Sequence, residues 1–133
     1  MPGILSDHNC EGQARIIFQE LDRIGYSALL DLHLLVFADV GLDVDANDEL
    51  VWTTCQSYGY LLLTGNRNTS DGDESLEVTM RRLAHDHVIP VLTISDLRRV
   101  QQDRDYAQRC ATTLAEVVLN LDLFRGVLRL YLP

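Results

Sequence analysis

The sequence contains no lysine, and all 11 of its basic residues other than histidine are arginine. Against these stand 20 aspartate and glutamate residues, which gives a formal net charge of −9 at pH 7. An acidic surface of this kind repels polyanions at long range, so nonspecific binding to a nucleic-acid backbone is disfavoured. Contact with a nucleic acid would therefore have to be local, through clustered arginines or bridging metal ions.

Cysteine is scarce, odd in number and widely spaced. Cys10, Cys55 and Cys110 form no C-x-x-C pair, so the sequence indicates neither a disulfide framework nor a zinc ribbon. We expect these thiols to be buried and idle, in a reducing compartment.

Long hydrophobic runs and targeting signals are also missing. The apolar stretch 29–37 is interrupted by Asp31 and His33 and is far shorter than a membrane span. The first residues turn acidic too soon, at Asp7, to resemble a signal peptide. We therefore expect a soluble, cytoplasmic protein without membrane contact. With 133 residues, 47% of them hydrophobic and 23% charged, the chain suits one globular domain, 1–133.

Short apolar runs alternate along the chain with longer segments of helical periodicity. The run 29–37 is either a second strand or a short buried helix, because periodicity does not separate the two. Strands alternating with helices predict an α/β fold, a three-layer α/β/α domain with a mainly parallel central sheet. The predicted strands are 3–7, 60–64, 88–94 and 127–132, and the predicted helices are 10–25, 47–57, 75–86 and 103–123.

Several familiar catalytic motifs are absent. There is no G-x-G-x-x-G, Walker A, G-x-S-x-G or H-E-x-x-H pattern, so dinucleotide binding, P-loop hydrolysis and zincin chemistry have no support.

Polar side chains instead follow the ends of the predicted strands. In an open α/β sheet, ligands bind beyond the carboxyl ends of the strands, where the strand order reverses. We expect these side chains to meet at one edge of the sheet. They are Asp7, His8 and Asn9 after the first strand, Asn66, Arg67 and Asn68 after the central one, and Asp96 after the next.

Carboxylates also begin the helix 47–57, where Asn47 is the expected N-cap and Asp48 and Glu49 occupy the first turn. Carboxylate and amide oxygens are what a Mg²⁺ or Mn²⁺ site needs, and two such ions can clamp a phosphodiester displacement. Complementation of the helix dipole explains Asp48 and Glu49 equally well. For the acids of the polar stretch 65–74, a turn-forming role is the preferred interpretation.

His8 and the arginine pair Arg98 and Arg99 each have two alternative interpretations. His8 either contacts a phosphate or orients a carboxylate, or it has a structural role in its loop. Arg98 and Arg99 closely follow Asp96, so they either meet phosphates near the same edge or pair with surplus surface acids.

The residues taken together resemble the PIN-like family, specifically its small group of predicted toxin-type nucleases. The resemblance covers about the first 95 residues, and each motif gains specificity from its order and spacing. It is carried by Ile-Leu-Ser-Asp-His-Asn (4–9), Ala-Asp-Val-Gly-Leu (38–42), Asn-Asp-Glu (47–49) and Leu-Thr-Gly-Asn-Arg-Asn (63–68).

This resemblance implies a Mg²⁺-dependent ribonuclease fold with acids gathered at the carboxyl ends of a parallel sheet. Asp7 matches the first metal-binding aspartate, and Asp48 or Glu49 matches the acid at the start of the second core helix. Asn66 stands where the family usually has the aspartate of a Thr-x-Asp motif, and Asn68 stands where a further aspartate often follows. The site has therefore lost up to two negative charges, which Asp71, Asp73 or Glu74 from the loop, or Asp96 from the neighbouring strand, would have to supply.

Two hypotheses follow. In the first, the chain is an endoribonuclease, a toxin-like component in which Asp7, Asp48 or Glu49, Asn66 and Asp96 hold Mg²⁺ or Mn²⁺. His8, Asn9, Arg67 and Asn68 would then contact the RNA. In the second, the acidic site is degenerate and the domain is a non-catalytic binding or regulatory module. The resemblance also implies a homodimer and a protein partner or inhibitor.

Overall fold

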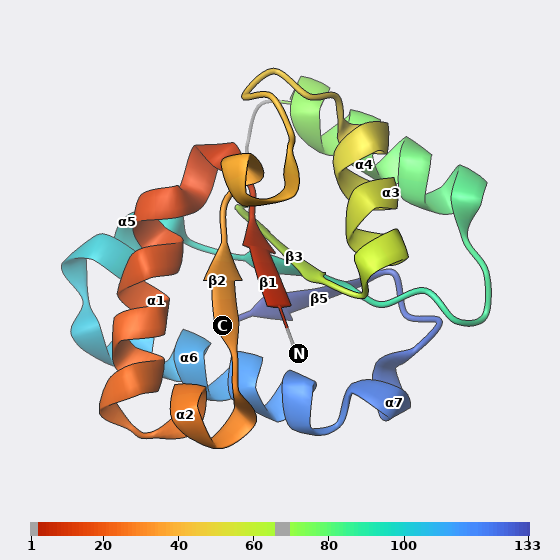
Figure 1. Cartoon of the computed structure of the whole chain (residues 1–133). Helices are drawn as coiled ribbons and strands as arrows, with labels where there is room; N and C mark the ends of the chain where they lie inside the picture. Colours follow the sequence, from red (N-terminus) through yellow and green to blue (C-terminus); the bar gives the residue numbers. More distant parts are fainter. Residues whose placement is uncertain (1–2, 66–69) are drawn as a thin grey trace.

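The computed structural model describes residues 3–65 and 70–133, with the side chains of 70–75 set aside (Figure 1). Within these residues, five strands form one parallel sheet in the order β2-β1-β3-β4-β5. The predicted α/β class and parallel sheet are confirmed. The strands are β1 (Gly3–Ser6), β2 (His33–Leu35), β3 (Leu61–Gly65), β4 (Val91–Ile94) and β5 (Arg129–Leu132).

Helices cover both faces of the sheet, and the strands bury side chains toward both. On β3, Leu61 and Leu63 join the core beneath α1, α5 and α6, which we call the α6 face. The intervening Leu62 joins the core beneath α3 and α4, which we call the α3 face. The helices are α1 (Glu11–Arg23), α2 (Tyr26–Leu30), α3 (Asp48–Tyr58), α4 (Ser70–Leu83), α5 (Leu97–Gln102), α6 (Arg104–Leu119) and α7 (Leu121–Phe124), with the 3-10 turns η1 (His8–Cys10) and η2 (Phe37–Val40).

The strand order reverses at β1. From β1 the chain crosses by α1 to β2 on one side, and from β2 it returns by α3 to β3 on the other side. The helix after β1 lies on the α6 face, whereas the helix after β3 lies on the α3 face. A crevice therefore opens between the carboxyl ends of β1 and β3, the position at which parallel sheets bind ligands.

The ambiguous run 29–37 is both a helix and a strand. Helix α2 ends at Leu30, and strand β2 begins at His33. Between them, Asp31 adopts the left-handed conformation, with φ of 51°, and its backbone N–H donates to Ala28 and Ser27. Aspartate tolerates this conformation better than most residues, so Asp31 ends the helix without glycine.

Three predicted helix boundaries are wrong. Helix α4 begins at Ser70 rather than at 75. Gly72 does not prevent this earlier start, and acids are favoured in the first turn of a helix because they suit the helix dipole. The predicted helix 103–123 is divided at Asn120 into α6 and α7. Helix α5, which the sequence did not predict, precedes α6. Asp96 caps α5 and Asp103 caps α6, each accepting backbone N–H groups.

In the part of the chain that the structure describes, no helix is both long enough and apolar enough to cross a membrane.

The central strand β3 offers a test of the core. Leu63 is fully buried, and we expect Leu63→Ala to lower the free energy of unfolding by about 2–5 kcal/mol, because it removes buried methyl groups and leaves a cavity. Leu123→Ala is the matched control, since Leu123 on α7 is 78% exposed and its truncation should change stability little. Urea denaturation of both variants measures the difference, and equal losses would contradict this description of the core.

Candidate functional site

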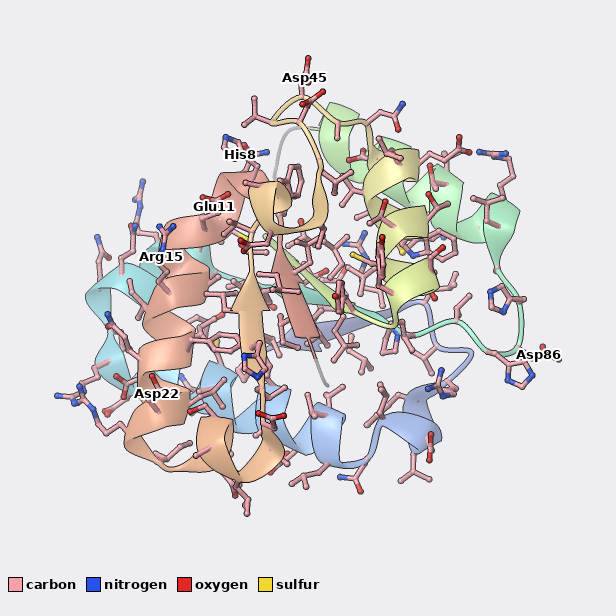
Figure 2. The ribbon with its side chains drawn as sticks, in the orientation of Figure 1. His8, Glu11, Arg15, Asp22, Asp45 and Asp86 are labelled. Atoms are coloured by element: carbon pink, nitrogen blue, oxygen red, sulfur yellow. The ribbon has the colours of Figure 1, made fainter. Side chains whose placement is uncertain are left out.

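A cavity of about 140 Å³ lies beyond the carboxyl ends of β1 and β3, on the α3 face of the sheet. His8 and Asp45, labelled in Figure 2, mark this end of the molecule, toward which β1 points. Three segments that are distant in sequence converge there: the residues after β1, the segment after β2, and the start of α3. The lining residues are Asp7, His8, Asn9, Phe37, Val44, Ala46, Asp48, Val51, Leu62 and Leu76.

The carboxylate of Asp7 is held by β3. Its backbone N–H continues the β1–β3 pairing by donating to the Leu63 carbonyl at 2.8 Å. The Thr64 hydroxyl donates to Asp7 Oδ2 at 2.9 Å. The backbone carbonyl of Asp7 accepts from the Ser6 hydroxyl at 2.9 Å and from the backbone N–H of Cys10 at 3.1 Å. Both the main chain and the carboxylate of Asp7 are thus fixed at the cavity wall.

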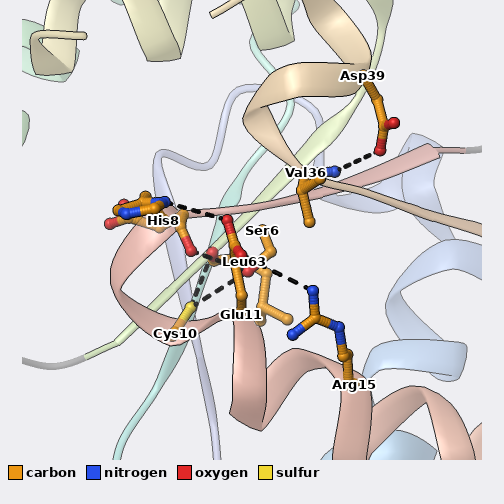
Figure 3. A network of polar contacts seen from close by, with 9 residues as sticks. Ser6, His8, Cys10, Glu11, Arg15, Val36, Asp39 and Leu63 are labelled. Carbon is orange, nitrogen blue, oxygen red and sulfur yellow. Dashed lines mark hydrogen bonds and ion pairs between the residues drawn. The ribbon is translucent and has the colours of Figure 1, made fainter. Parts of the chain in front are cut away.

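Buried thiols lie around this aspartate. Cys10 Sγ donates to the Leu63 carbonyl at 3.4 Å and lies 3.6 Å from the Ser6 hydroxyl (Figure 3). Burial, and to a lesser degree the negative charge of Asp7, raises the pKa of Cys55 to about 12. All three cysteines are free and buried, which confirms that part of the prediction. A protonated thiol at Cys55 packs as a small apolar group and supplies no nucleophile.

Asp48 reaches the same cavity from α3. Asn47 caps this helix as predicted, accepting the backbone N–H of Leu50 at 2.9 Å. Asp48 is the first residue of the helix and lines the cavity, whereas Glu49 forms an ion pair with Arg82 on α4. Of the two acids that the sequence leaves open, the structure brings Asp48, and not Glu49, into the cavity wall with Asp7.

His8 and Asn9 complete the polar wall. His8 Nδ1 lies 3.2 Å from Glu11 Oε2, and Glu11 Oε1 lies 3.8 Å from the Arg15 guanidinium (Figure 3). The ring of His8 also lies 6.0 Å from the ring of Phe37. These contacts fix the imidazole at the rim of the cavity, so His8 has both a structural contact and access to a ligand.

Other predicted site residues lie elsewhere. Asp96 follows β4 at the same edge, but its Oδ1 accepts the backbone N–H of Arg99 at 3.1 Å, and it does not line the cavity. Asn66, Arg67 and Asn68 lie outside the described residues. The structure therefore brings together Asp7, His8, Asn9 and Asp48 from the predicted set.

The sequence analysis missed Thr64 and the apolar wall. Thr64 is 3% exposed and is the residue that orients Asp7. Its signal was available, since a hydroxyl at the end of a strand buried on both faces must find a hydrogen-bond partner. Phe37, Val44 and Ala46 gave no such signal, because the segment after β2 reads only as an irregular loop.

The donors of the cavity suit a hard cation with few protein ligands. Mg²⁺ is commonly bound by one or two carboxylates and keeps several waters. Asp7 and Asp48 supply two carboxylates, and Asn9 supplies an amide oxygen. Among the described side chains, those of 3–65 and 76–133, no three His, Cys, Asp or Glu gather as a metal-binding group. The oxygen donors in the cavity wall are of the type that Mg²⁺ or Mn²⁺ takes.

No known protein-family model, curated protein or solved structure matches this chain. The function must therefore be argued from the cavity itself.

The Thr64–Asp7 hydrogen bond can be tested by stability. Thr64→Val removes a donor to a carboxylate, and we expect a loss of about 1–3 kcal/mol in the free energy of unfolding. Thr64→Ser keeps the hydroxyl and should lose less. The loss on Thr64→Val should shrink in an Asp7→Ala background, because the two residues are coupled. Additive losses in the double variant would show that the hydrogen bond does not hold Asp7.

Proposed function

We propose that this protein is a metal-dependent endoribonuclease of the PIN-like type. The observation that carries the proposal is that Asp7 and Asp48, which are 41 residues apart in sequence, line one cavity at the reversal of strand order. Ligands of parallel α/β sheets bind at this position, and paired carboxylates there suit a cation that acts on a phosphate.

The size of the cavity favours a phosphodiester within a longer strand. Pockets that enclose a whole small molecule usually measure about 300–1,000 Å³, whereas this cavity measures about 140 Å³. A phosphate group fits such a volume, and a complete nucleotide does not. The rest of the strand would lie across the mouth of the cavity, where Val44 is exposed.

Each residue of the wall has a role in this proposal. Asp7 and Asp48 would hold Mg²⁺ or Mn²⁺, which when bound activates a water and stabilises charge on the phosphate oxygens. Thr64 fixes the orientation of Asp7, and the positive end of the α3 dipole favours ionised Asp48. Asn9 and His8 are placed to contact phosphate oxygens. Phe37, Val51 and Leu62 form the apolar side of the wall, which lowers the local dielectric.

A second candidate is a PIN-like module that binds without cleaving. It is favoured by the small donor set, since the described residues bring only two carboxylates to the cavity. Asn66 and Asn68, in place of the aspartates usual in the PIN-like family, also favour a module without catalytic activity. A toxin-like role, a protein inhibitor and a homodimer remain predictions from the resemblance to the PIN-like family.

Calorimetric titration of Mn²⁺, followed by a cleavage assay on a labelled single-stranded RNA, separates the two candidates. We expect saturable binding and cleavage by the wild type, and loss of both in Asp7→Asn and Asp48→Asn, because each variant removes a charged ligand. Glu49→Gln is the matched control. It neutralises the neighbouring acid of the same helical turn, which pairs with Arg82 outside the cavity, and it should keep both properties.

The outcomes point in opposite directions. Full cleavage by Asp7→Asn would remove this aspartate from the mechanism. Failure of the wild type to bind Mn²⁺ or to cleave RNA would favour the non-catalytic module. Equal losses in Glu49→Gln and Asp48→Asn would mean that general negative charge, and not the cavity wall, governs binding.

A further inference from the structure

Positive charge is concentrated on one segment of this acidic chain. Residues 98–109 hold four of the 11 arginines and only two acids, so the segment carries a formal charge of +2 in a chain of −9. All four of these arginines are exposed: Arg98, Arg99, Arg104 and Arg109. They lie on α5 and the first turns of α6, on the α6 face.

Tyr106 fixes two of these guanidiniums. Arg99 lies 4.4 Å from the centroid of the Tyr106 ring, and Arg109 lies 5.5 Å from the same centroid. The ring itself is buried, so the two arginines cover it from outside. Cation–π contacts of this kind hold the arginine side chains in place and reduce the entropy that a ligand would have to remove.

Not all of this charge is neutralised locally. Arg99 pairs with Asp103 at 3.1 Å, and Arg104 lies 3.6 Å from Glu20. For Arg98 and Arg109, no ion pair is found in the part of the chain that the structure describes. These two arginines thus remain available to an anionic ligand.

The segment begins at the edge of the sheet where the cavity opens. Helix α5 starts three residues after β4 ends, and the backbone N–H of Asp96 donates to the Tyr106 hydroxyl at 3.1 Å. Leu97 packs so closely on the end of β3 that a Cβ atom on Gly65 would lie 2.5 Å from its side chain. Arg98 therefore follows a residue in contact with the strand that also holds Asp7.

We propose that Arg98, Arg99 and Arg109 form a docking surface for the phosphate backbone of the RNA strand whose scissile phosphate enters the cavity. This inference rests on the proposed function, and it goes further by giving the strand a path from the cavity over the ends of β3 and β4 to α5. Phosphate contacts of this kind position a nucleic acid without reading its sequence. The surface also overcomes locally the repulsion that a charge of −9 exerts on a polyanion.

An acidic protein surface is the other anion that these arginines suit. The segment 39–49 of a second copy carries five acids and no base, so it is the natural competitor. Two copies of charge −9 repel each other, however, and α5, which carries Arg98 and Arg99, follows β4 at the carboxyl edge of the sheet that bears the cavity. These two observations favour RNA, and self-association becomes an outcome of the test.

The test measures binding without cleavage. The anisotropy of a labelled single-stranded RNA of about 16 nucleotides is followed in EDTA at several salt concentrations. We expect Arg98→Gln/Arg109→Gln to weaken binding roughly tenfold and to reduce the slope of log K against log salt by about 1.4, since each single-strand phosphate contact contributes about 0.7. Arg98→Lys/Arg109→Lys keeps the charge and should keep most of the slope.

Arg81→Gln/Arg125→Gln is the control, because it removes the same charge from exposed arginines of α4 and of the residue after α7. It should leave the slope unchanged. Equal losses in the two double variants would overturn the proposal, because net charge alone would then account for binding. Failure of the wild type to bind RNA at low salt would overturn it too. A change in sedimentation without a change in RNA binding would assign the surface to self-association and overturn it.

The failure of this proposal can be told apart from the failure of the proposed function. Cleavage that depends on Asp7, with RNA binding that ignores Arg98 and Arg109, would overturn the docking surface alone. RNA binding that depends on the two arginines, without Mn²⁺ binding or cleavage, would support the docking surface and overturn the nuclease.

Discussion

The parallel pairing of β1 with β3 is the constraint on which the rest of the molecule depends. It places the first strand of the chain between β2 and β3, so the connections leave toward opposite faces and a crevice opens between the two strand ends. The same pairing continues one residue past β1, through the N–H of Asp7 and the carbonyl of Leu63. The main chain of Asp7, whose carboxylate stands in the cavity wall, is thereby held by the ladder that builds the core.

Charge sets the second constraint, and it acts in two opposite directions. Two acids, Asp7 and Asp48, stand in the cavity wall, and the segment 39–49, which includes Asp48, carries five acids and no base. A polyanion approaches such an edge poorly unless a cation or an arginine surface offsets the repulsion. Asp7 and Asp48 line the cavity on the α3 face, whereas Arg98 and Arg99 lie on α5, on the α6 face. Strands β1, β3 and β4 lie between them, so one sheet edge presents both signs of charge.

The sequence predicted the sheet better than the helices. Runs such as Leu61–Gly65 are short, apolar and bounded by glycine, and a strand buried on both faces is what such a pattern forms. Helix boundaries depended on caps whose side chains compete with the helix interior, and Asp31 and Asp96 illustrate this. The sequence analysis identified neither as a cap, yet one ends α2 in the left-handed conformation and the other starts α5.

The candidate site was predictable where residues follow a strand directly. Asp7, His8 and Asn9 line the cavity because a strand end has little freedom. The choice between Asp48 and Glu49 was not predictable, since adjacent helical residues point in directions about 100° apart and only the position of Arg82 shows which one turns away. The role of Thr64 also required the register of β3 against β1, which no local pattern encodes.

The early start of α4 shows how the polar residues after β3 were misinterpreted from the sequence. The acids at 71, 73 and 74 were expected in a loop, but they belong to the opening turns of a helix that starts five residues after β3 ends and contributes Leu76 to the cavity wall. Acids suit the dipole at the start of a helix, so residues that resemble a polar loop in the sequence suit a helix start equally well. A polar run after a buried strand therefore does not distinguish a loop from the first turns of the next helix.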